Sequence, residues 1–305
     1  MKYVIGLGEA LFDCLPTGRK LGGAPANFAY HVSQFGFQSY AISAIGDDEL
    51  GQEIIDTFEQ VGLHYCLPKV DFPTGTVQVT LNEQGIPQYE IKLGVAWDNI
   101  PLTPELTNLA QHAKAVCFGS LAQRSEVSRA TIQHFLESTP KETLKVFDIN
   151  LRQRWYNREV IETSLQHCNI LKINDEELDI VAPMLLSVTT DPSNLIAADK
   201  EKAVRVCRAL IELYELKMVI LTCGTNGSYV INKEICNFIP TPKVEVADTV
   251  GAGDSYSAAF LCEYLKRGNI QTAAEAGANI FVAGSALFKQ EDYEKAVAEL
   301  RAAAN

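Results

Sequence analysis

A run of small residues in front of an acidic residue is the strongest chemical signal in the sequence. The segment Asp248-Thr249-Val250-Gly251-Ala252-Gly253-Asp254 leads into a stretch rich in small residues that favours a helix. Consecutive amides of Gly251, Ala252 and Gly253 at a helix N-terminus would form an anion cradle, and small side chains permit close approach. Asp254 would accept a proton from an attacking hydroxyl. The segment predicts phosphoryl transfer; the alternative is a tight loop in which Asp254 only caps the helix.

A second glycine-rich turn, Gly22-Gly23-Ala24-Pro25-Ala26-Asn27, leads into a helix near the N-terminus. Gly23 would let the backbone approach a ligand, and Asn27 would hydrogen-bond sugar hydroxyls. A plain helix start with proline in its first turn explains the same residues equally well.

Short apolar strands that alternate with helices must position these turns. The strands are expected at 3–8, 39–45, 114–118, 144–149, 168–173 and 217–222, and the helices near 25–35, 47–61, 126–137, 157–166, 175–182 and 200–215. This order indicates a mostly parallel, doubly wound sheet, in which ligands bind beyond the carboxyl ends of the strands. Five polar or glycine residues are expected just past such ends: Asp13, Asn150, Arg152, Asn174 and Gly224.

Residues 74–95 follow a different pattern. Apolar and polar residues alternate on both sides of Asn82-Glu83-Gln84-Gly85, which predicts a β-hairpin with one solvated face. An amphipathic hairpin inserted among buried strands suggests a lid or a dimer contact.

The composition restricts the class of protein. The 305 residues carry a net charge of −12, which disfavours general nucleic-acid binding. None of the eight cysteines forms a CxxC pair, so we expect reduced thiols and no zinc site. We expect no signal peptide and no membrane span, and therefore a cytoplasmic location without membrane partners.

The motifs GEALFDCLP, GGAPANFA, GDDELG, AWDNIP, FDINLR, KINDEE, LTCGTNGS and DTVGAGD occur in this order. In them the chain resembles the ribokinase-type (PfkB) carbohydrate kinases, and within that family the bacterial fructokinases, from about residue 3 to about residue 268. The resemblance implies an α/β fold over residues 1–305, a ribokinase-like three-layer sandwich with a mostly parallel central sheet. It also implies a small β-sheet lid with strands near 13–22 and 74–98.

The resemblance further implies residue roles around a sugar. Arg152 would bridge the sugar and the transferred phosphate, because a guanidinium fork matches phosphoryl oxygens; a surface ion pair is the alternative. Trp97 is almost as well explained as a core residue. The implied sugar contacts are Asp13, Gly23, Asn27, Ala96, Trp97 and Asn150.

For the other substrate the resemblance implies ATP with Mg²⁺. Asn174 and Glu177 match an N-x-x-E pattern that organises hydrated Mg²⁺, although helix capping explains the pair as well. A nucleotide-phosphate loop after a strand would contain Thr222, Gly224 and Gly227, which an ordinary turn explains equally. The backbone carbonyls of Asp248 and Val250 would contribute to a monovalent-cation (K⁺) site, and Asn279 would face the purine.

The tail, residues 269–305, departs from the kinase pattern. Its V-A-G-S-A-L-F segment resembles the end of a ribulose-phosphate 3-epimerase, where such a segment binds phosphate. We reject epimerase activity, because the five histidines show no placement that fits the metal ligands of such a barrel. Within the tail, 271–283 is expected to form a helix with Ala273, Ala276, Ile280 and Ala283 turned inward.

The expected function is phosphorylation of a primary hydroxyl, fructose giving fructose 6-phosphate. Alternative substrates are 2-keto-3-deoxygluconate, ribose or a nucleoside. An alternative of another class is a catalytically weak protein that binds a sugar or a nucleotide. A homodimer through the lid hairpins is a further implication of the resemblance.

Overall fold

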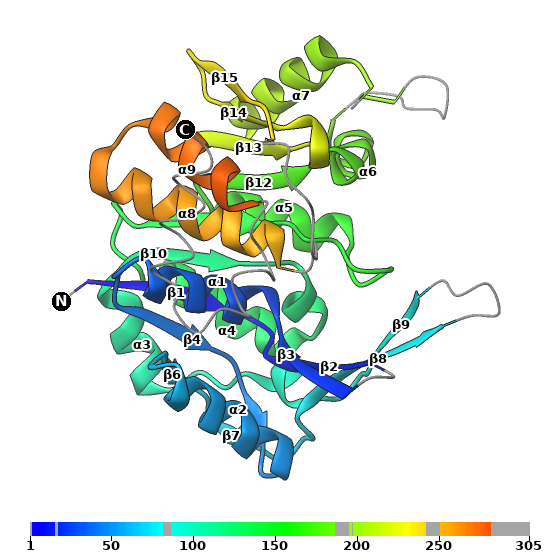
Figure 1. Cartoon of the computed structure of the whole chain (residues 1–305), viewed down its shortest axis with the longest axis vertical. Coiled ribbons are helices and arrows are strands. Elements are labelled where there is room, and N and C mark those ends of the chain that lie inside the picture. Colours follow the sequence, from blue (N-terminus) through cyan, green and yellow to red (C-terminus); the bar gives the residue numbers. More distant parts are fainter. Residues whose placement is uncertain are drawn as a thin grey trace. The chain divides into compact units, whose positions relative to one another are not determined.

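The computed structural model describes residues 2–15, 18–81, 87–186, 195–196, 198–241 and 251–281. The chain divides into two compact units (Figure 1). Unit 1 consists of Met1–Ser33 and Phe37–Thr143, and unit 2 of Gln34–Gly36 and Leu144–Asn305. The residues expected to contact sugar fall in unit 1, except Asn150, and those expected to handle phosphate fall in unit 2.

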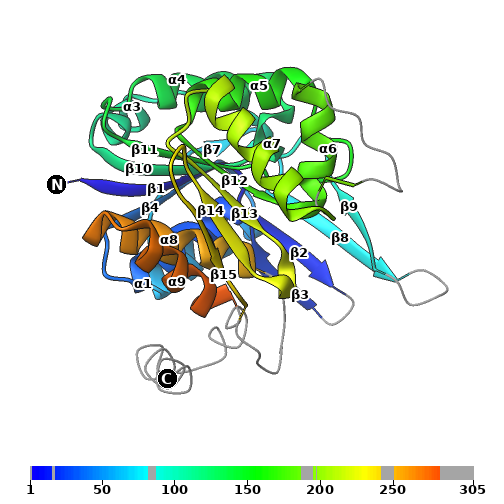
Figure 2. The same cartoon turned by 90° about the horizontal axis from the view of Figure 1, so that it is seen from above.

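Unit 1 is built on four parallel strands in the order β10-β1-β4-β6. The helix α1 lies on one face of this sheet, and α3 and α4 lie on the other (Figure 2). The bounds are β1 (Tyr3–Leu7), α1 (Ala24–Gln34), β4 (Ser39–Ile42), α2 (Glu49–Gln60), β6 (His64–Cys66), α3 (Pro104–Gln111), β10 (Ala113–Phe118) and α4 (Glu126–Glu137).

A small four-stranded sheet extends from unit 1 as the blue and cyan arm of Figure 1. Its order is β3-β2-β8-β9, with bounds β2 (Leu11–Leu15), β3 (Gly18–Gly22), β8 (Gly75–Leu81) and β9 (Pro87–Ile91). Buried Val77 and Val79 alternate with more exposed residues on β8, as the predicted hairpin requires. The expected turn residues 82–85 lie outside the described residues. Asp13 was expected past a strand end, but it lies inside β2.

Unit 2 continues the same construction with the parallel strands β11, β12 and β13, followed by antiparallel β14 and β15. The helices α5, α6 and α7 lie on one face, and α8 and α9 on the other (Figure 2). The bounds are β11 (Leu144–Asp148), α5 (Arg158–His167), β12 (Ile170–Asn174), α6 (Asp175–Leu185), α7 (Lys200–Leu213), β13 (Met218–Thr222), β14 (Ser228–Ile231), β15 (Cys236–Ile239), α8 (Ala252–Arg267) and α9 (Ile270–Phe281).

Polar caps fix the starts of many of these helices. In each case a side-chain oxygen of the residue before the helix accepts the backbone N–H three residues later, which satisfies a donor that the helix itself cannot pair. The capping residues are Asp48 for α2, Thr103 for α3, Asn157 for α5, Asn174 for α6 and Asp199 for α7.

The predicted α/β class, with a mostly parallel sheet and a separate small sheet, is confirmed. Within the described residues, no helix combines the length and the apolar character needed to cross a bilayer. All eight cysteines are free thiols, and five of them are buried. Burial raises the pKa of the Cys66 thiol to about 12, so this group stays protonated at neutral pH.

Candidate active site

The start of α8, from its N-cap Gly251 onward, has the geometry of an anion cradle. Gly251 adopts φ 76°, a left-handed conformation that favours glycine, and the first helical hydrogen bond runs from Ser255 N to Gly251 O at 2.9 Å. The amides of Ala252 and Gly253 precede that bond and point toward the helix N-terminus. Asp254 is the third residue of α8, so the alternative in which it is the N-cap is wrong.

Asp148 and Lys172 form a buried ion pair in the same unit, which the sequence analysis did not single out. They are register partners on β11 and β12, and Lys172 Nζ lies 3.0 Å from Asp148 Oδ1. The other carboxylate oxygen of Asp148 accepts a hydrogen bond from the Ser257 hydroxyl of α8 at 3.2 Å. Burial tends to lower the pKa of Lys172, but the carboxylates of Asp148, Glu177 and Asp254 outweigh it and raise the pKa to about 12.

Glu177 and Asn174 form a capping box at the start of α6. Asn174 Oδ1 accepts from Glu177 N at 2.8 Å, and Glu177 Oε2 accepts from Asn174 N at 2.9 Å. Glu177 Oε1 accepts from Leu151 N at 2.8 Å, so the carboxylate also fixes the segment after β11. Burial raises the pKa of Glu177, and the Lys172 ammonium opposes this rise. The capping box expected from the sequence is therefore present, and it leaves a buried carboxylate that would favour a cation nearby.

The segment after β11 contains two of the predicted residues. Asn150 has φ 42°, a left-handed conformation that asparagine tolerates better than most side chains. Arg152 is exposed, and its guanidinium donates to the Leu151 carbonyl at 3.2 Å. Among the described residues no ion pair includes Arg152. The alternative role, in which Arg152 only forms a surface ion pair, therefore gains no support from these residues. An exposed guanidinium on a strongly acidic chain is suited to an anionic ligand.

The predicted nucleotide loop follows β13. Thr222 ends this strand as the register partner of Asn174 on β12, so the two residues lie side by side at the carboxyl ends of neighbouring strands. Gly224 and Gly227 both have positive φ, 51° and 117°. A Cβ on Gly227 would lie 2.4 Å from the Ile239 carbonyl oxygen, which excludes any larger residue there.

In unit 1 the structure brings three predicted sugar contacts together. The carboxylate of Asp13 lies over Gly22, where an added Cβ would be 2.7 Å from its Oδ2. Gly23 has φ 111° and leaves no room for a side chain against the Glu9 carbonyl. Asn27 lies in the first turn of α1, and its backbone N–H donates to Gly23 O at 2.9 Å. Carboxylate and carboxamide side chains, such as those of Asp13 and Asn27, are able to hydrogen-bond sugar hydroxyls.

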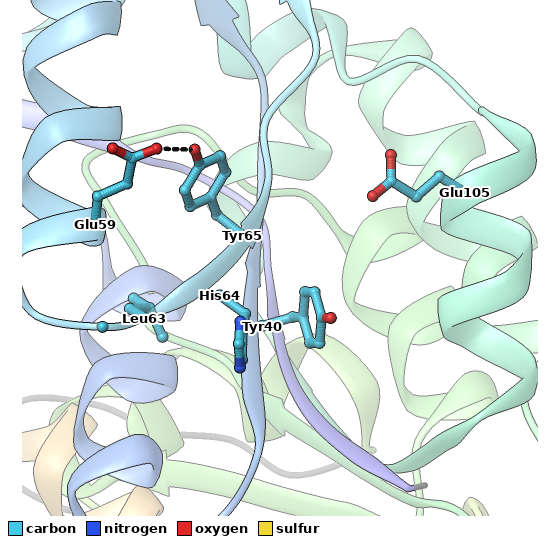
Figure 3. Close-up of a pocket in the computed structure, with 7 residues that line it drawn as sticks. Tyr40, Glu59, Leu63, His64, Tyr65 and Glu105 are labelled. Carbon is cyan, nitrogen blue, oxygen red and sulfur yellow. Dashed lines mark hydrogen bonds between the residues drawn. The ribbon is translucent and has the colours of Figure 1, made fainter.

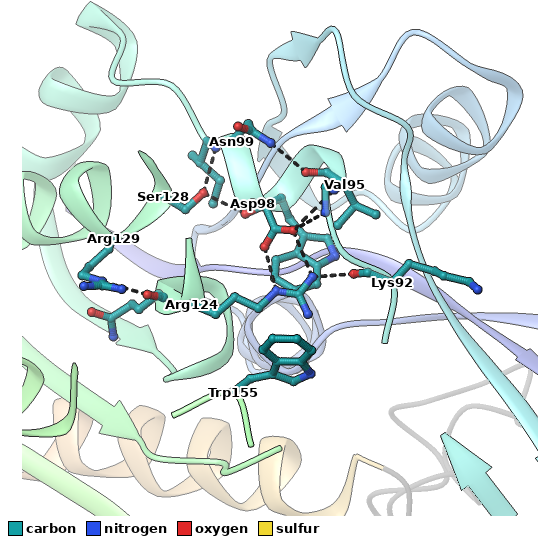
Figure 4. Close-up of polar contacts among 12 residues, drawn as sticks. Lys92, Val95, Asp98, Asn99, Arg124, Ser128, Arg129 and Trp155 are labelled. Carbon is teal, nitrogen blue, oxygen red and sulfur yellow. Dashed lines mark hydrogen bonds and ion pairs between the residues drawn. The ribbon is translucent and has the colours of Figure 1, made fainter. Parts of the chain in front are cut away.

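Ala96 and Trp97, also predicted to lie near the sugar, are buried in η1 (Ala96–Asn99), with 0% and 1% of their surface exposed. The guanidinium of Arg124 stacks over the Trp97 ring at 4.0 Å and donates to both carboxylate oxygens of Asp98, at 2.8 and 3.0 Å (Figure 4). Its Nη2 also donates to the Lys92 carbonyl, just after β9. This burial favours the core alternative for Trp97. Sequence reasoning missed Arg124, since nothing local pairs it with Asp98.

The helix α9 (Ile270–Phe281) is formed by the first part of the atypical tail. Ala273, Gly277 and Ala278 are buried on its inner face, whereas Ala276 is half-buried, so the predicted inward face is rotated. Gly277 packs on the Tyr256 ring of α8, since an added Cβ would lie 2.9 Å from it. Asn279 is exposed. Ala283 and the predicted cation-site residues Asp248 and Val250 lie outside the described residues, and the side chain of Ile280 is not described.

A separate pocket of about 450 Å³ lies beside the edge strand β6 in unit 1 (Figure 3). Its lining includes Tyr40, stacked on His64 at 5.2 Å, and Glu59, which accepts the Tyr65 hydroxyl at 2.9 Å. None of the predicted site residues lines this pocket. It therefore adds nothing to the site derived above.

Known proteins match the chain over most of its length. Residues 13–296 match the model of the pfkB family carbohydrate kinases. The fructokinase of Salmonella typhimurium is 29% identical over 276 residues, 86% of this chain and 84% of that protein. The ATP-dependent 6-phosphofructokinase of Thermoanaerobacterium thermosaccharolyticum is 27% identical over 296 residues, 90% of this chain and 86% of that protein.

Solved structures show the same fold. A double mutant of Vibrio cholerae fructokinase, with fructose, ADP and potassium ion bound, aligns with a TM-score of 0.76 at 20% identity. The alignment covers 99% of this chain and 98% of that protein. The sequence and structure comparisons thus agree on one group of proteins. Two members that are almost equally identical to this chain carry the names of different sugar kinases.

Proposed function

Because the chain belongs to the pfkB family of carbohydrate kinases, we propose that it transfers the γ-phosphate of ATP to the 6-hydroxyl of fructose. Membership makes it a sugar kinase; the choice of sugar and the residue roles are the proposal. The observation that carries it is Asp254 in the first turn of α8, directly after the amides of Ala252 and Gly253. A base and an anion cradle on consecutive residues match the two requirements of phosphoryl transfer.

In this mechanism Asp254 accepts the proton of the 6-hydroxyl as the hydroxyl oxygen attacks the γ-phosphorus. The bond from phosphorus to the bridging oxygen of ADP breaks, and ADP leaves. The amides at the start of α8 and the guanidinium of Arg152 stabilise the charge on the transferred group. Thr222, Gly224 and Gly227 bind the remaining phosphates of ATP through the turn after β13. Asn279 is the proposed purine contact.

The site also suits Mg²⁺. Each oxygen of the Glu177 carboxylate accepts one backbone amide and keeps a lone pair for a water molecule of a hydrated ion. Burial raises the pKa of Glu177 although the Lys172 ammonium opposes the rise, and a divalent ion beside the carboxylate would lower the pKa further. Among the described residues no three His, Cys, Asp or Glu side chains form a metal cluster, so Glu177 and Asn174 would hold the ion through water. Bound Mg²⁺ would neutralise phosphate charge.

On the sugar side, Asp13 is the residue that favours a neutral substrate. A carboxylate can accept hydrogen bonds from two sugar hydroxyls, and it repels a substrate that carries its own carboxylate or phosphate. Gly23, Asn27 and Asn150 supply further contacts. We propose no ligand contact for Ala96 or Trp97, which are buried. The bound potassium of the Vibrio cholerae enzyme favours a similar K⁺ site here, at the carbonyls of Asp248 and Val250.

We assign the lid to the small sheet of β2, β3, β8 and β9. Closing it over the sugar would exclude water and limit wasteful hydrolysis of ATP. Asp13 lies on one of its strands, so sugar binding and lid position would be coupled.

A sugar panel tests the proposal. ADP release would be measured with ATP and Mg²⁺ against fructose, ribose, 2-keto-3-deoxygluconate, fructose 6-phosphate and a nucleoside, with the product identified by NMR. We expect the highest kcat/KM with fructose and a product phosphorylated on the 6-hydroxyl. A higher kcat/KM with another sugar would show that this sugar, and not fructose, is the preferred substrate. Binding of fructose without turnover on any sugar would contradict the kinase mechanism.

A further inference from the structure

We propose that Lys172 is a positioning residue for phosphoryl transfer, whose ammonium supports the turn that carries Asp254. This inference rests on the proposed function, since it assigns a role within the same reaction. Lys172 is held at its place by Asp148 and by the packing of α8 against the sheet.

The first observation is the burial of the ion pair. Only 9% of the Lys172 side chain and 7% of the Asp148 side chain are exposed, and the two charged groups are 3.0 Å apart. An apolar pair at these strand positions would satisfy the core without removing two charges from water. The neighbours of Lys172 on β12 are Leu171 and Ile173, both buried. A buried charge among them indicates a role beyond packing.

The second observation is the place of the ammonium relative to the turn. A Cβ added to Gly253 would lie 3.1 Å from Lys172 Nζ, so the ammonium lies directly against the second residue of α8. Gly253 is the last of the three small residues that precede Asp254, and is its direct neighbour in the chain. The ammonium therefore adds a full positive charge to the partial positive charge of the helix N-terminus.

The third observation is how the ammonium is held. Asp148 binds Lys172 with one carboxylate oxygen and the Ser257 hydroxyl with the other. Ser257 is three residues after Asp254, and therefore lies on the same side of α8. One carboxylate thus connects β11, β12 and the helix that carries the base. Loss of either partner would change where the first turn of α8 lies.

Four titratable groups surround the ammonium. They are Asp148 of β11, Glu177 of α6, and Asp254 and Tyr256 of α8. Lys172 is thus one cation amid three carboxylates. By reciprocity the ammonium stabilises the Asp254 carboxylate.

This charge has a specific use in the reaction. A triphosphate brings negative charge next to a carboxylate that must stay ionised to accept a proton. Coulomb repulsion between them would favour protonation of Asp254 or its displacement from the turn. A fixed cation against Gly253 offsets that repulsion. We therefore expect Lys172 to affect the chemical step, and to contribute little to the binding of the sugar.

The experiment compares the wild-type protein with Lys172→Met, Lys172→Arg and the double variant Lys172→Met with Asp148→Asn. The double variant removes both charges, so it keeps the protein folded if the single Met variant fails to fold. Lys217→Met is the matched control, because Lys217 is an exposed lysine in the same unit. Circular dichroism checks the fold, and kcat and KM are measured with fructose and ATP.

We expect kcat to fall by about 10²-fold in the double variant, with the KM for fructose within about threefold of wild type. Lys172→Arg should recover part of the loss, and Lys217→Met should match wild type. A folded double variant with wild-type kcat would overturn the inference while leaving the proposed function intact. A wild-type protein that phosphorylates no sugar would instead overturn the proposed function, and the inference with it.

Discussion

The guanidinium of Arg124 lies 4.0 Å from the centroid of the Trp97 ring, and both side chains are buried. The same guanidinium donates to both oxygens of Asp98 and to the Lys92 carbonyl after β9. Asp98 in turn accepts the amide of Gly94 at 3.1 Å. This cluster therefore anchors the segment through which the small sheet returns to the body of unit 1.

Arg124→Met is expected to lower the free energy of unfolding by about 3 kcal/mol or more, because it leaves the Asp98 carboxylate buried without a cation. Urea unfolding measures the loss. The matched control is Arg158→Met, which removes an exposed ion pair with Glu162 and should lower the free energy of unfolding far less. Equal losses in the two variants would show that the buried cluster does not stabilise unit 1.

Arg152→Gln is expected to lower kcat by about 10² or more, because in the proposed mechanism the guanidinium stabilises the transferred phosphoryl group. Arg152→Lys should recover only part of the rate, since an ammonium lacks the planar fork. Stability should be unchanged, because Arg152 is exposed. Arg154→Gln, on an exposed residue of the same segment, is the control. Wild-type turnover in Arg152→Gln would remove this residue from the mechanism.

Glu177→Gln is expected to raise the Mg²⁺ concentration needed for half-maximal rate by about tenfold or more, because the ion loses its nearby carboxylate. A magnesium titration at fixed ATP measures this. Glu176→Gln is a good control, since Glu176 is the exposed neighbour in the same helix turn. Should both variants titrate like wild type, Glu177 would serve only as part of the capping box of α6.

The buried side chain of His31 is expected to make the free energy of unfolding depend on pH. This side chain is fully buried, and burial lowers the pKa of His31 to about 4 from an ordinary value of 6.5. Between these values the unfolded chain binds a proton that the folded chain does not, so the free energy of unfolding rises with pH across this window. The total change attributable to His31 is about 3 kcal/mol.

Urea unfolding between pH 4 and pH 7 checks this dependence. His31→Leu should flatten the dependence over that window, whereas His134→Gln should keep it, because His134 is exposed. An unchanged slope in His31→Leu would mean that other groups cause the acid destabilisation.

Much of the fold follows from local patterns. The strands of the parallel sheet are short apolar runs, and Asp48 and Asn174 are recognisable helix caps. The alternation in β8 predicted an amphipathic strand. These features depend on neighbours in sequence, so a single sequence reveals them. The proposed role of Asp254 was also accessible, because the proposed base and cradle occupy one continuous segment.

Other features depend on partners far apart in sequence. In the sequence, Lys172 is a single polar residue in an apolar strand. Only the register of β12 against β11 places it beside Asp148. Arg124 and Asp98 are 26 residues apart, and no local signal pairs them. The position of Asp13 inside β2 depends on pairing with β3 and β8. Such relationships arise from tertiary packing, and the motif strings do not contain them.

The most direct test of the mechanism is the turnover of Asp254→Asn, with Glu263→Gln on the same helix as control. The asparagine keeps the shape of the side chain but cannot accept the proton, so we predict that kcat with fructose falls by about 10³. Fructose binding should stay within about threefold of wild type, and Glu263→Gln should remain fully active. If Asp254→Asn retained turnover within about tenfold of wild type, Asp254 would not be the catalytic base and the proposed mechanism would be wrong.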